Sequence, residues 1–417
     1  MQRSYRVAGA AQRRRWFSSP KSGYRWGMAS SALVQDKALG YSGGPGICDN
    51  LLIKGDNLAV LRALHASHAG QVKCIYIDPP YNKGGAFAHY DDNRAHAAWL
   101  SFMRERLEAM RPLLAPNGIL FVQIDDAEGA YLKVMADEVF GRANYVGQFV
   151  WEKKRKPSFL DANLAIVTEV ILAYSPDRRF APPFVGGLTT ANKKYPLNNA
   201  GNPVATLAFP AGTVHFGCGD GFIPAGDMSG GNIVTELLDP VEVVCGTNAG
   251  AFRLRGEWRY SQRTLDALLA AGERITISKA PFRPNHVKAG GEAKKLKNLL
   301  SVAHYPVGTY EDSAAESEAL FGRDPFDYPK PEGLIRLLLG AVTAPGDLVL
   351  DAFAGSGTTG AVAHKMGRRW IMVEIGDQAQ THIAPRLSKV IDGAEPGGVT
   401  AAAEWGGGGG FRFYRVA

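Results

Sequence analysis

The chain has 417 residues, of which 46% are hydrophobic and 21% are charged, with a formal net charge of +7. This composition is ordinary for a globular protein, and the length allows two domains or one large domain with an insertion. The sequence contains no apolar run long enough for a transmembrane helix, which argues against a membrane protein. Its cysteines are scattered without metal-ligand spacing, so we expect a reduced cytoplasmic protein without a metal site.

The positive charge is concentrated in two stretches. Residues 1–35 hold seven basic residues and no acidic one, and residues 151–304 hold 19 basic against 13 acidic residues. We expect residues 1–48 to be a basic extension that is disordered and lies outside the fold. This extension weakly matches a transit peptide, fits an arm that contacts nucleic acid, or results from a misassigned start with Met28 as the true first residue. The basic middle segment fits contact with a polyanion, with a merely solvated surface as the alternative.

Strand and helix patterns alternate between residues 49 and 150. In chain order we expect a strand at 51–53, a helix at 58–64, a strand at 72–77, a helix at 96–114, a turn at 116–118, a strand at 119–124 and a helix at 130–140. Such alternation predicts a parallel sheet covered by helices on both faces. The strand at 72–77 must end where Pro79 and Pro80 follow, because proline cannot continue a central ladder.

The regular pattern is lost in residues 151–304, which are rich in Gly, Pro, Asn and basic residues. Alternation then resumes, and we expect a helix at 332–339, a strand at 348–350, a helix from 358, a strand at 370–373, a helix ending near 390 and a final strand at 411–415. The sequence therefore predicts one α/β domain in two parts, residues 49–150 and 305–417, split by an irregular, basic insert.

The motif Asp78-Pro79-Pro80-Tyr81 follows the predicted strand at 72–77. The amino group of adenine is a poor nucleophile because its lone pair is delocalised into the ring. Asp78 and the carbonyl of Pro79 can accept its two hydrogens and expose the lone pair for in-line attack on a methyl sulfonium. Tyr81 can stack on a base that has left the helix. Phe87 and Tyr90 could line the pocket for that base, although core packing explains them equally well.

A second motif follows the predicted strand at 348–350. Gly355, Gly357 and Gly360 match G-x-G-x-x-G between a strand and a helix, where such glycines admit a ligand close to the backbone. Glu374 ends the next predicted strand, where an acid can bind ribose hydroxyls. This motif fits a nicotinamide enzyme nearly as well, but that chemistry would leave Asp78–Tyr81 without a role. The two motifs together suggest methyl transfer from S-adenosylmethionine to a base amine.

With these motifs, the chain resembles DNA adenine-N6 methyltransferases of the beta arrangement, in which the amine-handling motif precedes the cofactor loop. It is most similar to the modification (Mod) subunits of bacterial type III restriction-modification systems. The resemblance is carried by residues 51–57, 75–82, 99–103, 121–126, 326–331 and 411–414. It implies a circularly permuted, Rossmann-like methyltransferase fold in which residues 151–304 are the target recognition domain.

The resemblance also implies roles for individual residues. The catalytic positions would be Asp78, Pro79, Pro80 and Tyr81. The positions that contact S-adenosylmethionine would be Asp351, Phe353, Gly355, Gly357 and Thr358, with Glu374 on its ribose, Lys330 and Pro331 beside its methionine end and Asp56 near its adenine. Asp56 also fits a helix cap that needs no ligand.

We therefore expect a site-specific adenine-N6 methyltransferase that flips its target base out of double-stranded DNA. Candidate DNA contacts, for which a solvated face is the alternative, are Lys153, Lys154, Arg155, Lys156, Arg253 and Arg255. The expected partners are a second copy of the chain and a restriction (Res) subunit. Because the chain is shorter than typical type III modification subunits, a solitary enzyme is the alternative. Cytosine-N4, RNA or a protein amide are alternative substrates, and an inactive DNA-binding remnant is the alternative from another class.

Overall fold

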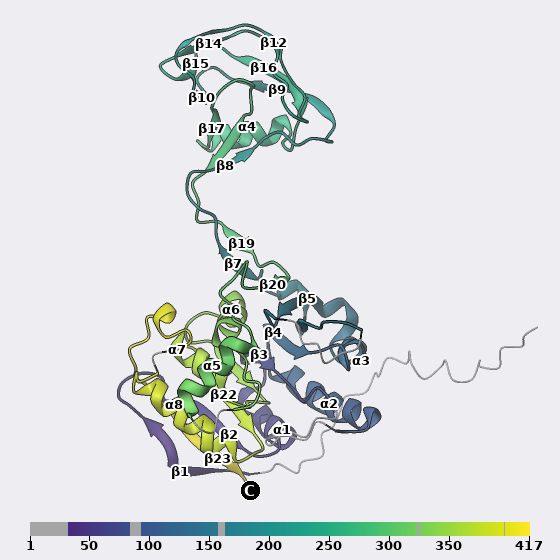
Figure 1. The fold of residues 1–417 in the computed structure, drawn as a ribbon, viewed down its shortest axis with the longest axis vertical. Helices are drawn as coiled ribbons and strands as arrows, with labels where there is room; N and C mark the ends of the chain where they lie inside the picture. Colours follow the sequence, from purple (N-terminus) through teal and green to yellow (C-terminus); the bar gives the residue numbers. More distant parts are fainter. Residues whose placement is uncertain (1–31, 84–92, 157–162, 323–325, 396) are drawn as a thin grey trace, which may run out of the picture.

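The computed structural model describes residues 32–83, 93–156, 163–322, 326–395 and 397–417. These residues form a larger α/β part and a smaller β-rich part, joined by a narrow neck (Figure 1). The larger part is built on a ten-stranded sheet, and the smaller part has sheets of seven and four strands. The predicted α/β class is confirmed, and the smaller part lies within the stretch predicted as an insert.

The large sheet has the strand order β1-β23-β2-β22-β21-β3-β4-β6-β5-β20. Its strands are β1 (Leu33–Ser42), β23 (Gly410–Val416), β2 (Asn50–Lys54), β22 (Arg369–Glu374), β21 (Leu348–Asp351), β3 (Val72–Ile77), β4 (Leu114–Ile124), β6 (Thr168–Tyr174), β5 (Tyr145–Glu152) and β20 (Leu299–Leu300). The run from β23 to β4 is parallel throughout. Strands β21 and β22, late in the chain, lie between the early strands β2 and β3, as expected for a permuted Rossmann-like sheet.

Helices cover both faces of this sheet. One face carries α1 (Asn57–His68), α2 (His96–Met110) and α3 (Gly129–Ala136), and the other carries α6 (Glu332–Val342), α7 (Thr358–Lys365) and α8 (Ala384–Ile391). Successive side chains of a strand point to opposite faces. Ile75 and Ile77 of β3 therefore pack in the core beneath α1, α2 and α3, and Cys74 and Tyr76 pack in the core beneath α6, α7 and α8. The remaining helical segments of the larger part are α5 (Tyr310–Phe321), η1 (Arg111–Leu113), η2 (Asp137–Gly141), η3 (Arg142–Asn144), η4 (Arg178–Phe180), η5 (Ala379–Ile383) and η6 (Ala401–Ala403).

The smaller part has its own hydrophobic core, formed by residues between Leu197 and Phe282. Its seven-stranded sheet contains β11 (Gly221–Ile223), β14 (Val241–Val244), β15 (Thr247–Asn248), β10 (Val214–Phe216), β17 (Arg274–Ile277), β18 (Asn285–Lys288) and β8 (Lys193–Pro196). Its four-stranded sheet contains β12 (Gly226–Asp227), β13 (Thr235–Leu237), β16 (Phe252–Glu257) and β9 (Val204–Phe209), and α4 (Gln262–Ala270) is its helix. The neck is the antiparallel pair β7 (Val185–Leu188) and β19 (Ala293–Lys295).

The structure corrects the predicted boundary at residue 151. That boundary falls inside β5, and both β5 and β6 belong to the large sheet, where β6 pairs antiparallel with β4 and with β5. The helical segment η4 that follows β6 still contacts β4 of the larger part, so the insert begins at the neck strand β7. It ends at β19 rather than at residue 304, because β20 pairs with β5 in the large sheet. Residues 116–118, predicted as a turn, form an irregularity within β4, where Val72 pairs with Leu114 and Cys74 pairs with Ile119.

The prediction that residues 1–48 lie outside the fold is wrong for β1. This strand pairs antiparallel with β23 at the edge of the large sheet, and Tyr41 donates a hydrogen bond of 2.7 Å to Asp392. Because β1 is an edge strand, many of its side chains are exposed and its sequence lacks a buried pattern. Residues 1–31 lie outside the described residues. The three interpretations of the N-terminal extension, as a transit peptide, an arm that contacts nucleic acid or a misassigned start, therefore stay predictions. Within the described residues, no helix combines the length and apolar character needed to cross a bilayer.

Candidate active site

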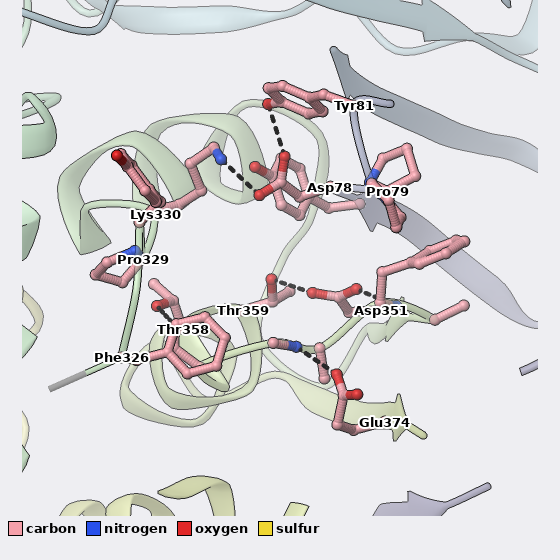
Figure 2. Close-up of a pocket in the computed structure, with 18 of the residues that line it drawn as sticks. Asp78, Pro79, Tyr81, Phe326, Pro329, Lys330, Asp351, Thr358, Thr359 and Glu374 are labelled. Atoms are coloured by element: carbon pink, nitrogen blue, oxygen red, sulfur yellow. Dashed lines mark hydrogen bonds and ion pairs between the residues drawn. The ribbon is translucent and has the colours of Figure 1, made fainter. Parts of the chain in front are cut away.

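A cavity of about 510 Å³ opens at the carboxyl ends of the central strands of the large sheet. Asp78 follows β3, Asp351 ends β21 and Glu374 ends β22, and these strands are parallel neighbours. The carboxyl ends of parallel strands meet at one edge of the sheet. This geometry brings Asp78 to the two acids that lie far from it in the sequence (Figure 2).

The cavity contains most of the predicted site. Its lining includes the four predicted catalytic residues Asp78, Pro79, Pro80 and Tyr81 and, from the predicted cofactor set, Asp56, Lys330, Asp351, Phe353, Gly355, Thr358 and Glu374. Two predicted cofactor contacts, Gly357 and Pro331, do not line it. Pro331 is the N-cap of α6, and the preceding Pro329 lines the cavity in its place.

The glycine turn shapes one wall of the cavity. Gly355 has a φ of +53° and Gly357 a φ of +79°, a region that side chains rarely tolerate. A Cβ on Gly357 would lie 2.9 Å from Cγ2 of Ile383, whereas a Cβ on Gly355 would meet nothing closer than Phe326 at 3.5 Å. Gly357 therefore lets α7 begin against its neighbour η5, and the backbone of Gly355 faces the cavity.

The acids beside this turn are held by hydrogen bonds. Asp351 accepts from the backbone N–H of Phe353 at 2.9 Å and from the hydroxyl of Thr359 at 2.6 Å. Burial raises the pKa of Asp351 to about 7, although these two hydrogen bonds oppose the shift. Glu374 accepts from the backbone N–H of Gly355 at 2.8 Å through Oε2, which fixes the acid against the turn.

Asp56 performs the structural role foreseen for it and also lines the cavity. Its carboxylate accepts from the backbone N–H groups of Leu58 and Ala59 and thereby caps α1, and it pairs with Arg106 at 2.9 Å. Arg106 also lies over the ring of Phe102, 3.5 Å from its centroid. The cap, the ion pair and the ring hold this wall of the cavity in place.

Asp78 is held from two sides. Its Oδ1 lies 2.8 Å from the hydroxyl of Tyr81, and its Oδ2 lies 2.5 Å from the ammonium of Lys330. Burial raises the pKa of Asp78, while Lys330 opposes the shift. The indole N–H of Trp99 donates to the carbonyl of Pro80 at 2.8 Å, which anchors the turn after β3.

Sequence reasoning missed Glu169, which lies on β6 and is buried in the wall of the cavity. Its carboxylate is within hydrogen-bond distance of four donors, namely Tyr81, Gln123, Lys153 and Tyr310. The sequence does contain a signal for Glu169, because it stands within the otherwise largely apolar β6, Thr-Glu-Val-Ile-Leu-Ala-Tyr. A glutamate inside an apolar strand is seldom buried unless it is paired.

The predicted DNA contacts lie in three different settings. Lys153, predicted as a DNA contact with a solvated face as the alternative, is instead buried and paired with Glu169 at 3.2 Å. Lys153 and Lys154 both line the cavity. Arg155 and Lys156 are exposed, and Arg155 pairs with Asp312 at 2.8 Å.

The two predicted arginine contacts of the insert lie on β16. Arg253 pairs with Asp239 at 2.8 Å and Arg255 with Glu236 at 3.4 Å. Phe87 and Tyr90, candidates for the base pocket, lie outside the described residues.

Comparison with known proteins places this site in a family. Residues 72–385 match the family of DNA methylases that is named for N6 and N4 methyltransferases. The chain belongs to this family. It is 32% identical over 416 residues to the probable type III HindVI Mod subunit of Haemophilus influenzae, covering 88% of this chain and 54% of that one. Family membership and the similarity to Mod subunits, both expected from the motifs, are confirmed.

Other relatives are also named as DNA methyltransferases. The type II methyltransferase M.EcaI of Enterobacter cloacae is 28% identical over 342 residues, covering 79% of this chain and 67% of that one. DNA adenine methyltransferase YhdJ of Escherichia coli is 53% identical over 105 residues, covering 25% of this chain and 30% of that one. The chain spans about half the length of the type III relatives HindVI and StyLTI that it matches.

Two solved structures align with most of the chain at low similarity. The complex of M1.HpyAVI with SAM has a TM-score of 0.38 and 15% identity, covering 81% of this chain and 99% of that one. The cytosine-N4-specific PvuII DNA methyltransferase has a TM-score of 0.44 and 15% identity, covering 83% of this chain and 90% of that one.

Proposed function

We propose that the chain is a site-specific DNA methyltransferase that transfers a methyl group from S-adenosylmethionine to N6 of adenine in double-stranded DNA. The observation that carries the proposal is one cavity that holds both the Asp78–Tyr81 turn and the glycine turn after β21. Membership of the DNA methylases supports methyl transfer. The adenine preference is supported by the aspartate at position 78 and by the relative named as an adenine methyltransferase.

The residues around the glycine turn fit S-adenosylmethionine, which supplies an electrophilic methyl group on a cationic sulfonium. Asp351 and Glu374 contribute two carboxylates to the wall, which suit a cationic ligand with ribose hydroxyls. The backbone of Gly355 is open to the cavity, and Phe326 and Phe353 contribute aromatic rings. A volume of about 510 Å³ is also suitable for a ligand of this size.

In the proposed reaction the chain positions the target amine. Asp78 and the carbonyl of Pro79 accept the two amine hydrogens, and the ring of Tyr81 stacks on the flipped base. Both oxygens of Asp78 are engaged in the free protein, by Tyr81 and Lys330, so the incoming amine must replace one of these partners. Much of the acceleration comes from holding the nitrogen in line with the methyl group. No covalent intermediate between protein and base is required.

The insert, residues 185–295, suits the role of target recognition domain. It has a separate core, and exposed lysines lie on β8 and on the neck strand β19, namely Lys193, Lys194, Lys294 and Lys295. The pairs made by Arg253 and Arg255 are exposed, and exposed ion pairs are weak. DNA phosphates can therefore displace Asp239 and Glu236 from these arginines at little cost.

The partners of the chain follow from the same proposal. Several similar proteins are named Mod subunits of type III restriction-modification enzymes, which supports association with a restriction (Res) subunit. We further propose a homodimer and a bacterial cytoplasmic location, where DNA is accessible. A solitary methyltransferase is the alternative, because M.EcaI, which matches 79% of this chain, is named a methyltransferase and not a subunit.

Modified-base sequencing of plasmid DNA tests the proposal. The full chain is expressed in bacteria that lack other DNA methylation, and the plasmid is read by single-molecule sequencing. N6-methyladenine at one short motif is the expected result. Detection of N4-methylcytosine instead would show that the substrate base is cytosine. Unmodified DNA, together with S-adenosylmethionine binding, would favour the inactive remnant and overturn the proposal.

Asp78→Ala tests the assignment of the catalytic turn. Loss of the carboxylate removes an acceptor for the amine, so we expect methylation to fall by at least about 10³-fold. The glycine turn is untouched, so the S-adenosylmethionine dissociation constant should stay within about 3-fold of the native value, as measured by calorimetry. Methylation at the native rate would refute the assigned role of Asp78.

A further inference from the structure

The hydroxyl of Tyr81 lies between two carboxylates. Its oxygen is 2.8 Å from Oδ1 of Asp78 and 2.9 Å from Oε2 of Glu169. A phenol carries one proton, so at any moment Tyr81 can donate fully to only one of the two acids. The side chain therefore has two hydrogen-bonding states with the same ring position, one that occupies Asp78 and one that releases it.

Glu169 is built into this arrangement by further contacts. The amide of Gln123 donates to its Oε2 at 2.8 Å, and the hydroxyl of Tyr310 donates to its Oε1 at 2.8 Å. Lys153 pairs with Oε1 at 3.2 Å. A buried carboxylate is costly to desolvate, and an apolar residue would serve packing at least as well. The full set of donors indicates that this position needs a fixed acceptor.

The surrounding charges keep the two acids different. Lys330 pairs with Asp78 and lies over the ring of Tyr81, 5.3 Å from its centroid. Burial opposes the ionisation of Glu169. The charges of Lys330 and Lys153, together with hydrogen bonds from Gln123 and Tyr310, nevertheless hold the pKa of Glu169 below its usual range. Burial raises the pKa of Asp78, and the charge of Glu169 contributes to that rise. The surroundings therefore favour the charged form of Glu169 and make Asp78 easier to protonate.

We propose that Glu169 is a positioning residue for methyl transfer. It accepts the hydrogen bond of the Tyr81 hydroxyl when the target amine arrives at Asp78. This inference rests on the proposed function. In the free protein the Tyr81 hydroxyl lies within hydrogen-bond distance of Oδ1 of Asp78 and competes for it. When the amine donates to that oxygen, the hydroxyl turns to Glu169, so the tyrosine ring stays in place and no buried donor is left unpaired. No bond to hydrogen is broken; only hydrogen-bond partners change.

Glu169→Gln removes this second state of Tyr81. The glutamine carbonyl then faces the Lys153 ammonium, which has no acceptor. Its NH₂ group faces Tyr81 and Gln123, whose amide must turn its own carbonyl toward it. The tyrosine hydroxyl can then donate only to Asp78 and competes with the amine. We expect the single-turnover methylation rate to fall by about 10- to 100-fold, with the S-adenosylmethionine dissociation constant within about 3-fold of native.

A double-variant cycle with Tyr81→Phe separates this role from a structural one. Phenylalanine keeps the stacking ring and removes the competing hydroxyl, so adding Glu169→Gln to Tyr81→Phe should slow the reaction by less than about 3-fold further. Tyr174→Phe is the matched control. Tyr174 lies on β6, the strand that carries Glu169, and its hydroxyl donates to Asp137 outside the cavity. It should leave the rate unchanged.

The pH dependence of the rate gives a second readout. The groups that act on the pKa of Asp78 are Glu169, Lys330 and Tyr81, and Tyr76, Tyr310 and Asp351 also interact with it. Glu169→Gln removes a negative charge that raises the pKa of Asp78, so the acidic limb of the single-turnover rate should move to lower pH. A purely structural effect would leave that limb in place.

Two outcomes would overturn the inference. One is a double variant whose loss equals the product of the two single losses, and the other is a native rate with an unmoved acidic limb in Glu169→Gln. If Glu169→Gln does not fold, Glu169→Asp replaces it, since it keeps the charge beside Lys153 but withdraws the oxygen from Tyr81. Absence of methylation by the unsubstituted chain would instead overturn the proposed function, and this inference with it.

Discussion

At the scale of single residues, the buried carboxyl of Asp351 makes the unfolding free energy of the protein depend on pH. Its folded-state pKa of about 7 lies above the ordinary value of 3.8, mainly because the carboxyl is buried. The folded chain therefore binds more protons than the unfolded chain between these values. The contribution of Asp351 to stability is complete below the lower value and is lost as the pH rises through about 7. A cationic ligand beside the ionised acid would offset that loss.

Asp351→Asn should therefore stabilise the free protein at alkaline pH. Asparagine retains an acceptor for the N–H of Phe353 and a polar contact for Thr359, but it carries no charge. The raised pKa of Asp351 corresponds to at most about 4 kcal/mol of lost unfolding free energy at pH 8.5. The Tm of the variant should therefore rise more at pH 8.5 than at pH 5. S-adenosylmethionine affinity should fall at least about 10-fold. Scanning fluorimetry at both pH values checks the first effect, and equal Tm changes at both would contradict it.

At the scale of secondary-structure elements, the start of α7 depends on a glycine that faces away from the cavity. The N-cap Gly357 is left-handed, and Ile383 of η5 packs where its side chain would lie. One residue thus sets both the direction of α7 and the path of the preceding turn, which presents Gly355 to the cavity. The glycine motif in the sequence is therefore partly a packing requirement and partly a ligand requirement.

Gly357→Ala tests this division of roles. The left-handed conformation costs about 1 kcal/mol for alanine, and the contact with Ile383 adds to it. Gly346→Ala is the matched control, because Gly346 has a φ of +86° and nothing within 4 Å of the added Cβ. Gly357→Ala should lower the unfolding free energy by about 1–3 kcal/mol more than the control and weaken S-adenosylmethionine binding. Equal destabilisation by both variants, measured by urea unfolding, would exclude the Ile383 contact.

Elements with a clear local sequence pattern could be predicted, and elements defined by distant strand pairing could not. Asp78 and Asp351 were found because each follows a continuous apolar strand and belongs to a motif with local meaning. Glu169 was not, because β6 comes after the regular alternation ends and pairs antiparallel with strands that the local sequence does not specify. Strand β1 was missed for a related reason, since its partner β23 lies at the other end of the chain. Strand pairing over such distances is not encoded in local periodicity.

At the scale of the whole molecule, the insert is attached to the sheet edge through one narrow neck (Figure 1). Among the described residues, its core shares no residue with the two cores of the larger part. Each part therefore buries its own apolar surface, and neither needs the other to form a core. The active-site cavity is lined by the larger part alone.

Removal of the insert tests this independence. Leu188 of β7 and Ala293 of β19 are direct antiparallel partners, so a two-residue Asn-Gly turn can replace residues 189–292 and close a hairpin. The shortened chain should fold and bind S-adenosylmethionine within about 3-fold of native affinity. Its DNA affinity should fall at least about 10-fold, because the deletion removes the exposed Lys193, Lys194, Arg253 and Arg255. Calorimetry and fluorescence anisotropy at fixed salt measure the two affinities. Retained motif-specific methylation would show that recognition lies outside the insert, and loss of cofactor binding would show that the two parts are energetically coupled.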